Sequence, residues 1–162
     1  ARMINARSET LRDKTAFREA YRKRRCLVLA DGYYEWQRSG AVKQPYFIHL
    51  ASAEPFGMAG LWESWRDRAS GERLESCTIV TTQPAASIAH LHDRMPVILP
   101  LDAHGEWLDP GNEDVARLDR LLVPYDAAPI AARPVGPRVN NARNEGAELI
   151  EPVGAQQELL IR

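Results

Sequence analysis

Residues 26–51 read CLVLADGYYEWQRSGAVKQPYFIHLA, two apolar, strand-like runs on either side of a turn signal at Ser39-Gly40. β-Branched and aromatic residues bounded by Gly, Pro and Ser are typical of strands joined by tight turns. The pattern continues with GMAGLWESW and SCTIVTT, which flank a turn signal at Ser70-Gly71, and then with MPVILP. We therefore predict an α+β fold with a mainly antiparallel, barrel-like β-sheet core and peripheral helices.

Other segments add helices and outer strands to this core. Good helix formers without a breaker predict a helix that begins at Asp13 or Thr15 and runs to about Arg25. Shorter helices are expected at residues 85–91, 102–109 and 113–122, and closing strands at 146–153 and 158–162. RMINARS, residues 2–8, reads as a short strand with Asn5 and Arg7 on one face.

Length and composition are those of a cytoplasmic globular protein. A chain of 162 residues is most economically one domain, and no apolar run approaches the roughly 20 residues that span a bilayer. Cys26 and Cys77 both lie in apolar runs, which predicts two buried thiols without a disulfide. We expect a monomer with no membrane partner.

The charge of the chain is unevenly distributed. Residues 1–26 carry nine lysines and arginines against three acidic residues, although the whole chain is near neutral. The nine are Arg2, Arg7, Arg12, Lys14, Arg18, Arg22, Lys23, Arg24 and Arg25. This pattern indicates either a basic surface that faces a polyanion or a solvated helix that leads into a strand.

DGYYEW, residues 31–36, is the first candidate for chemistry. In an extended segment Tyr33 and Glu35 share one face, and Tyr34 and Trp36 share the other. A carboxylate among aromatic rings is partly desolvated, which raises its pKa and suits it to proton transfer near neutral pH. Glu35 is therefore a candidate catalytic residue, although an ordinary surface glutamate has the same pattern. For Trp36, the alternation favours the core over stacking on a base.

HLHDR, residues 90–94, is the second candidate and leads directly into MPVIL. Extended geometry places His90, His92 and Arg94 on one side and Asp93 on the other. A His-x-His pair can chelate a metal, so a metallohydrolase that uses His90 and His92 is one interpretation. No HExxH or paired CxxC accompanies it, and we predict neither a metal nor another cofactor. His92 as an acid–base or orienting group beside the anion-binding Arg94 is preferred to the metal site, and a hydrogen-bonded histidine at the start of a strand stays an open alternative.

INAR, residues 4–7, is the third candidate. Asn5 offers a donor and an acceptor, and Arg7 offers a planar fork that matches a phosphate. The sequence has no GxSxG, P-loop or GxGxxG motif.

Taken in order, five stretches resemble the SOS response-associated peptidase (SRAP) family: INARSET, RRCLVLADGYYEW, TIVTT, HDRMPVIL and RVNNARNEGAELIEPV. The resemblance runs through nearly the whole chain. It implies a nucleoid-associated DNA-damage (SOS) protein that recognises abasic sites in single-stranded DNA. It also implies a covalent link to the ring-opened sugar through an N-terminal cysteine, first as a Schiff base and then as a thiazolidine, with associated autoproteolytic and lyase-type activity.

The same resemblance assigns roles to six residues. Asn5 would hold the N-terminal group, Glu35 would shuttle protons, and His92 would assist proton transfer and orient the deoxyribose. Arg7 and Arg94 match family positions that grip phosphates, and Thr81 is a further DNA-binding candidate. The expected partner is single-stranded DNA that contains abasic sites.

The start of the sequence departs from the family. It begins with Ala1, four residues before NAR, where family members have a further segment that begins Met-Cys-Gly. We therefore expect a single SRAP-like domain over residues 1–162 that lacks its N-terminal portion, binds DNA weakly and forms no crosslink. Cys26 and Cys77 do not replace the missing cysteine, because neither carries a free α-amine. The open alternatives are a non-catalytic single-stranded DNA-binding module and a peptidase limited to its own N-terminus.

Overall fold

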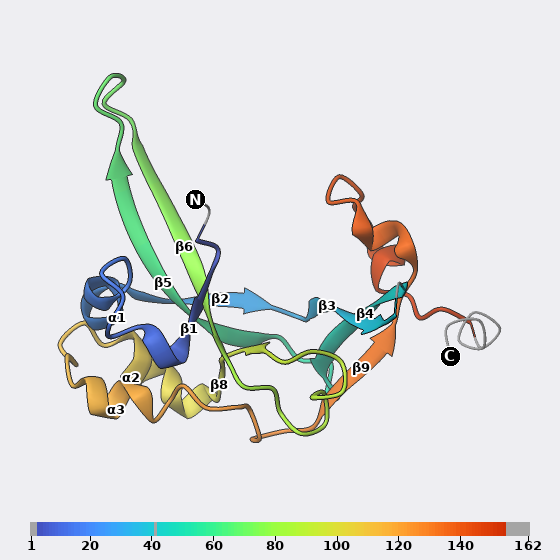
Figure 1. The fold of residues 1–162 in the computed structure, drawn as a ribbon. Coiled ribbons are helices and arrows are strands. Elements are labelled where there is room, and N and C mark those ends of the chain that lie inside the picture. Colours follow the sequence, from blue (N-terminus) through green and yellow to red (C-terminus); the bar gives the residue numbers. More distant parts are fainter. Residues whose placement is uncertain (1–2, 41, 155–162) are drawn as a thin grey trace. The chain divides into compact units, whose positions relative to one another are not determined.

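The computed structural model describes residues 3–40 and 42–154, which belong to two compact units (Figure 1). The first unit is formed by residues 1–30, 56–83 and 94–127, and the second by residues 31–55, 84–93 and 128–162. Each unit has its own sheet, and a single domain over residues 1–162 stays a prediction. No helix in the described part of the chain is long and apolar enough to cross a membrane.

The first unit is built on a six-stranded sheet. Its main path runs β1-β6-β5-β2, with β7 paired to β6 and β8 paired to β5. The strands are β1 (Asn5–Arg7), β2 (Arg25–Ala30), β5 (Phe56–Arg66), β6 (Arg73–Thr82), β7 (Met95–Pro96) and β8 (Ile98–Leu99). All of these pairs are antiparallel except β1–β6, in which Asn5 lies opposite Ile79 and Arg7 opposite Thr81.

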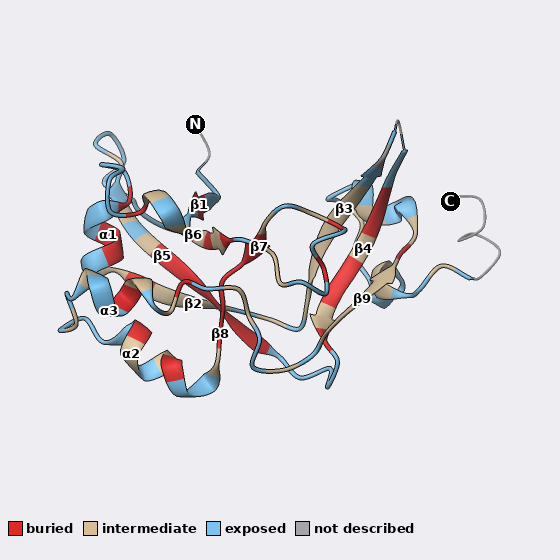
Figure 2. Cartoon of the chain, turned by 60° about the horizontal axis from the view of Figure 1, so that its bottom comes forward, coloured by how far each residue is buried: buried red, intermediate tan, exposed pale blue. Residues whose placement is uncertain are grey.

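Short helices pack against this sheet around a buried core. They are α1 (Arg18–Lys23), α2 (His104–Leu108) and α3 (Val115–Asp119), with single 3₁₀ turns at Ser8–Thr10 (η1) and Leu101–Ala103 (η2). Trp107 is fully buried; its indole donates to the Cys26 carbonyl at 2.9 Å, and its ring lies against Tyr21. In the first unit, Figure 2 shows buried residues on β5, on β8 and on the helices.

The second unit is built on a three-stranded antiparallel sheet of order β3-β4-β9. Its strands are β3 (Tyr33–Ser39), β4 (Val42–Leu50) and β9 (Ile130–Pro134), followed by 3₁₀ turns at Pro137–Asn140 (η3) and Ala147–Ile150 (η4). Phe47, Ile48 and Leu50 of β4 are buried, because β4 is the central strand. β3 pairs only with β4, so it forms an edge of this sheet.

The expected class, α+β with a mainly antiparallel, barrel-like sheet core and peripheral helices, is confirmed. The predicted alternation of INAR is found in part: Ala6 is buried between exposed Asn5 and Arg7, but Ile4, expected on the face of Ala6, precedes the strand and is 66% exposed. The helix expected from Asp13 or Thr15 to Arg25 is shorter, Arg18–Lys23, and turns precede it.

Two segments were predicted wrongly. Residues 85–91 form consecutive turns instead of a helix, and their apolar Ile88 and Leu91 are three residues apart, a spacing that turns satisfy as well. Residues 147–150 form η4 instead of a closing strand, and only an isolated bridge joins Pro152 to Val135. The strand expected at residues 158–162 lies outside the described residues.

The prediction that Cys77 is buried was also wrong, because its thiol is exposed. β1 pairs with β6 only at residues 79–81, and β2 pairs with β5 only as far as Leu61. Cys77 therefore lies on a two-stranded extension of β5 and β6 that neither neighbour flanks. Cys26, which pairs with Gly60 inside the sheet, is half-buried.

Candidate functional site

DGYYEW forms the edge strand β3 of the second unit and brings Glu35 to a pocket. Gly32 precedes the strand where the chain passes closely over β4: a Cβ there would lie 2.7 Å from the Ile48 carbonyl oxygen and would clash with the Phe47 ring. Glycine thus allows the close approach that sets the start of β3. From there, Glu35 lies opposite Tyr46 and Trp36 opposite Pro45.

Glu35 and His92 lie side by side in the second unit, although 57 positions separate them in sequence. The distance from Nδ1 of His92 to Oε1 of Glu35 is 3.8 Å, and Asp93 lies 3.4 Å from the same nitrogen. The Glu35 side chain is 21% exposed and that of Asp93 is 85% exposed. Of the two carboxylates near His92, that of Glu35 is therefore the sheltered one, and that of Asp93 lies in solvent.

Burial raises the pKa of the Glu35 carboxyl above its ordinary value, and the nearby His92 opposes this only in part. Desolvation disfavours the charged form of a carboxyl group, so Glu35 keeps its proton to a higher pH than an ordinary glutamate does. A sheltered carboxyl group in contact with an imidazole has the properties of a general acid–base pair.

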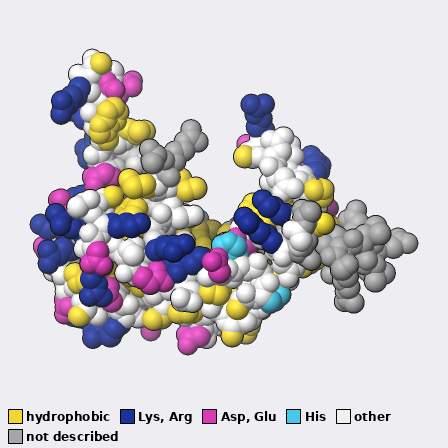
Figure 3. All heavy atoms as spheres, in the orientation of Figure 1, with side chains coloured by type: hydrophobic (Ala, Val, Ile, Leu, Met, Phe, Trp, Pro, Cys, Tyr) yellow, Lys and Arg dark blue, Asp and Glu magenta, His cyan; other side chains and the backbone are white. Residues whose placement is uncertain are grey.

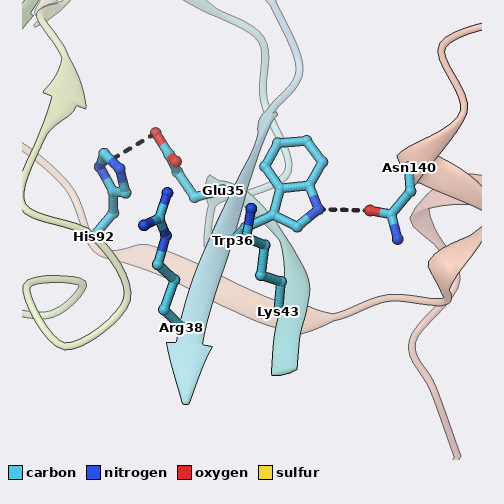
Figure 4. A pocket seen from close by; sticks show the side chains of 6 residues that line it. All are labelled: Glu35, Trp36, Arg38, Lys43, His92 and Asn140. Atoms are coloured by element: carbon cyan, nitrogen blue, oxygen red, sulfur yellow. Dashed lines mark hydrogen bonds and ion pairs between the residues drawn. The ribbon is translucent and has the colours of Figure 1, made fainter. Parts of the chain in front are cut away.

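These two side chains line a pocket of about 440 Å³ within the second unit (Figure 4). The pocket is lined by Glu35, Trp36, Arg38, Lys43, His92 and Asn140. Trp36 is half-buried at this pocket and is not part of the core, contrary to the preference drawn from the alternation. Its indole Nε1 donates a hydrogen bond to Oδ1 of Asn140, 2.7 Å away, which fixes the ring.

Asn5, Arg7, Thr81 and Arg94 belong to the first unit. Asn5 and Arg7 are exposed on β1, and Arg7 lies opposite Thr81 of β6. Arg94 is held by two bonds to the Glu9 carboxylate, of 2.6 and 3.0 Å, and also donates to the Thr81 carbonyl. Its guanidinium thus joins η1 to β6. The convergence of Asn5 with Glu35 and His92 stays a prediction.

His90 gives no sign of a metal site with His92. His90 is exposed, and its backbone carbonyl accepts a hydrogen bond from Gln37. Among the residues that the structure describes, no group of three His, Cys, Asp or Glu side chains is arranged to hold a metal ion. The described residues therefore give the metallohydrolase hypothesis no set of metal ligands.

Part of the basic N-terminal segment serves the fold of the first unit. Arg12 pairs with Asp119, Lys23 with Glu113, and Arg24 with Glu63. Arg25 is 6% exposed and donates to backbone carbonyls, including that of Trp107. Within the described part of this segment, the exposed cations are Arg7, Arg12, Lys14, Arg18, Arg22 and Lys23. Figure 3 shows cations and carboxylates interspersed on this face of the unit.

Sequence reasoning missed three residues of the pocket: Arg38, Lys43 and Asn140. Arg38 carried a usable signal, because it lies two residues after Trp36 on the same face of a predicted strand. Lys43 follows only from the register of the hairpin, in which it lies opposite Arg38. Asn140 belongs to a motif that was noticed, RVNNARN, but its link to Trp36 depends on the tertiary fold.

Comparison with known proteins gives a consistent result. The model of the family described as SOS response associated peptidase (SRAP) matches residues 1–142. The chain is 44% identical to "Abasic site processing protein YoaM" of Bacillus subtilis over 151 residues, 93% of this chain and 66% of that protein. It is 36% identical to "Abasic site processing protein HMCES" of Xenopus tropicalis, over 92% of this chain and 50% of that protein.

Solved structures show the same fold. A crystal structure of a protein from Bacteroides thetaiotaomicron matches with a TM-score of 0.85 and 32% identity, over 92% of this chain and 65% of that one. A second, from Bordetella bronchiseptica, matches with a TM-score of 0.71 and 34% identity, over 82% and 64% of the two chains. The chain thus spans between half and about two thirds of the length of these relatives.

Proposed function

Because this chain belongs to the SRAP family, we propose that it processes abasic sites in DNA and recognises them in single-stranded DNA. The observation that carries the proposal is the pair of Glu35 and His92, which lies in a pocket and on two of the stretches that resemble the family. The names of the relatives support DNA with abasic sites as the partner.

The chemistry follows from the substrate, since an abasic sugar opens to an aldehyde. In the proposed reaction the α-amine of an N-terminal cysteine, the residue that the family resemblance implies, adds to this aldehyde. Loss of water then gives an imine. A thiol of the same residue then adds to the imine carbon, and the nitrogen takes up a proton, which closes a thiazolidine. Ring opening and loss of water both need proton transfer, and the raised pKa of Glu35 supports this role for it.

We assign supporting roles to the other predicted residues. His92 orients the deoxyribose and assists proton transfer at Glu35, and Asn5 holds the attacking amine. Arg7, Arg94 and Thr81 hold the phosphates of the strand; the bidentate guanidinium geometry suits this task. For Arg94 this requires a phosphate to compete with, or to bind beside, the Glu9 carboxylate that already holds it.

The two cysteines of the chain are unsuited to the covalent step. Neither is N-terminal, so neither offers an amine beside its thiol. In addition, burial raises the pKa of the Cys26 thiol to about 11, which leaves little thiolate at neutral pH. We therefore propose that Cys26 and Cys77 take no part in a thiazolidine, and that the described residues bind and orient the abasic strand.

Binding and gel experiments test the proposal. Fluorescence anisotropy compares three labelled probes: single-stranded DNA with one abasic site, the same strand intact, and the duplex. The proposal predicts preference for the abasic single strand and no adduct on a denaturing gel. Equal affinity for all three probes would overturn the recognition of abasic sites, and an adduct would overturn the assignment of the two cysteines. Loss of activity with a chelator would instead favour a metallohydrolase.

A further inference from the structure

Two cations lie directly opposite each other at the pocket of the second unit. Arg38 of β3 pairs in register with Lys43 of β4, and both line the pocket beside Trp36. Both side chains are exposed. Like charges at directly opposed positions of adjacent strands repel each other, so this arrangement costs stability.

Neither cation is neutralised by the described part of the chain. In the second unit Arg138 pairs with Glu148, and the carboxylates of Glu35 and Asp93 lie near His92. Among the described residues, no carboxylate lies within ion-pairing distance of Arg38 or Lys43. An anion between the two side chains would relieve their repulsion.

The orientation of the two side chains fits such an anion. In Figure 4 both run in the same direction, and the charged end of Arg38 lies near the Glu35 carboxylate while that of Lys43 lies near the Trp36 ring. An arginine fork binds a phosphate through two parallel hydrogen bonds, and a lysine adds a compact charge. Glu35 is the only carboxylate among the lining residues, and burial favours its neutral form.

We propose that Arg38 and Lys43 form a phosphate-binding subsite that holds the backbone of single-stranded DNA next to the abasic position. The inference rests on the proposed function, because it uses the same pocket and the same substrate. It adds two DNA-binding residues in the second unit, which also contains Glu35. Arg7 and Arg94 belong to the first unit. The subsite recognises the backbone and therefore binds strands with and without the lesion.

The test is the salt dependence of binding by an Arg38→Gln/Lys43→Gln double variant of the 162-residue chain. The matched control is an Arg68→Gln/Arg120→Gln variant, which loses the same charge from exposed positions of the first unit. Urea unfolding curves establish that both variants fold. Anisotropy at several salt concentrations then gives affinities for the abasic and the intact single strand.

The expected result follows from counterion release, in which each phosphate contact contributes about 0.7 to the slope of log affinity against log salt. The Arg38–Lys43 variant should lose about 1.4 from that slope on both probes. When salt rises from about 50 to about 200 mM, the factor by which its affinity falls should then be about seven times smaller than the factor for the wild type. Its preference for the abasic strand should be retained, and the control variant should keep the wild-type slope.

Three results would overturn the subsite. One is a wild-type slope in the Arg38–Lys43 variant, and another is an equal loss of slope in the control, which would indicate a bulk charge effect. In both cases a retained preference for the abasic strand leaves the proposed function standing. If the wild type binds neither strand, the proposed function fails and the subsite fails with it.

Discussion

Replacing Arg94 by glutamine should destabilise the first unit, because its guanidinium joins two elements. Two hydrogen bonds, of 2.6 and 3.0 Å, link it to the Glu9 carboxylate in η1, and a third reaches the Thr81 carbonyl in β6. The side chain of Arg94 is 15% exposed, and that of Glu9 is 45% exposed. The resemblance to the SRAP family instead assigns Arg94 to DNA phosphates, so the two roles need to be separated.

The magnitude follows from these contacts. A hydrogen bond to a charged group contributes about 1.5–3 kcal/mol. Solvent screens part of the attraction because Glu9 is nearly half exposed, so about 1.5 kcal/mol is expected for the pair as a whole. The Thr81 carbonyl, left without its donor, adds about 1 kcal/mol. Arg94→Gln should therefore cost about 2.5 kcal/mol, which lowers the Tm by about 5–10 °C in a protein of this size.

Urea unfolding of Arg94→Gln, Glu9→Gln and the double variant measures this energy. The double variant should be about as stable as Arg94→Gln alone, because Glu9 acts through Arg94. An unchanged unfolding midpoint for Arg94→Gln, or fully additive losses, would refute the reasoning. DNA binding then separates the two roles. If Arg94 also holds a phosphate, Glu9→Gln should tighten single-strand binding by releasing the guanidinium, and Arg94→Gln should weaken it.

Other predictions rest on single side chains. The hydrogen bond from Arg94 lowers the pKa of Glu9. The stability that this pair contributes should therefore be present above the ordinary pKa of a glutamate and be lost as pH falls through the lowered value. In urea unfolding at several pH values, Glu9→Gln should lack this loss. Burial raises the pKa of Glu35, so its charge costs stability as pH rises through its folded pKa; Glu35→Gln should be more stable than the wild type at neutral pH, and the gain should vanish below a pH of about 4. A thiol reagent should modify exposed Cys77 quickly and Cys26 slowly, as followed by mass spectrometry. Trp107→Ala should cost about 3–5 kcal/mol in urea unfolding, because the indole is fully buried.

Local pattern was a sound guide where one face of a strand is buried and the other is not. The alternation in INAR correctly placed Asn5 and Arg7 on the face opposite Ala6, although it failed for Ile4, which lies before the strand and is exposed. It was a poor guide for Cys77, because the exposure of that residue depends on how far β1 and β2 extend along their partners. An apolar run in the sequence does not carry this information about strand length.

The candidate site shows the same limit. Glu35 could be proposed from its aromatic neighbours, and His92 from its place beside Arg94, but only the fold shows that Glu35 and His92 are in contact. The resemblance to a family linked these residues before the structure was known, whereas spacing along the chain could not. Arg38 and Lys43 were missed because their meeting depends on the register of the β3–β4 hairpin.

The central claim is that Glu35 and His92 recognise the abasic sugar. The most direct test is the ratio of affinities for an abasic and an intact single strand, measured for the wild type and for a Glu35→Gln/His92→Gln variant that unfolds cooperatively. We predict a clear preference for the abasic strand in the wild type and a ratio near one in the variant, with affinity for the intact strand unchanged. A variant that keeps the wild-type ratio would contradict the claim.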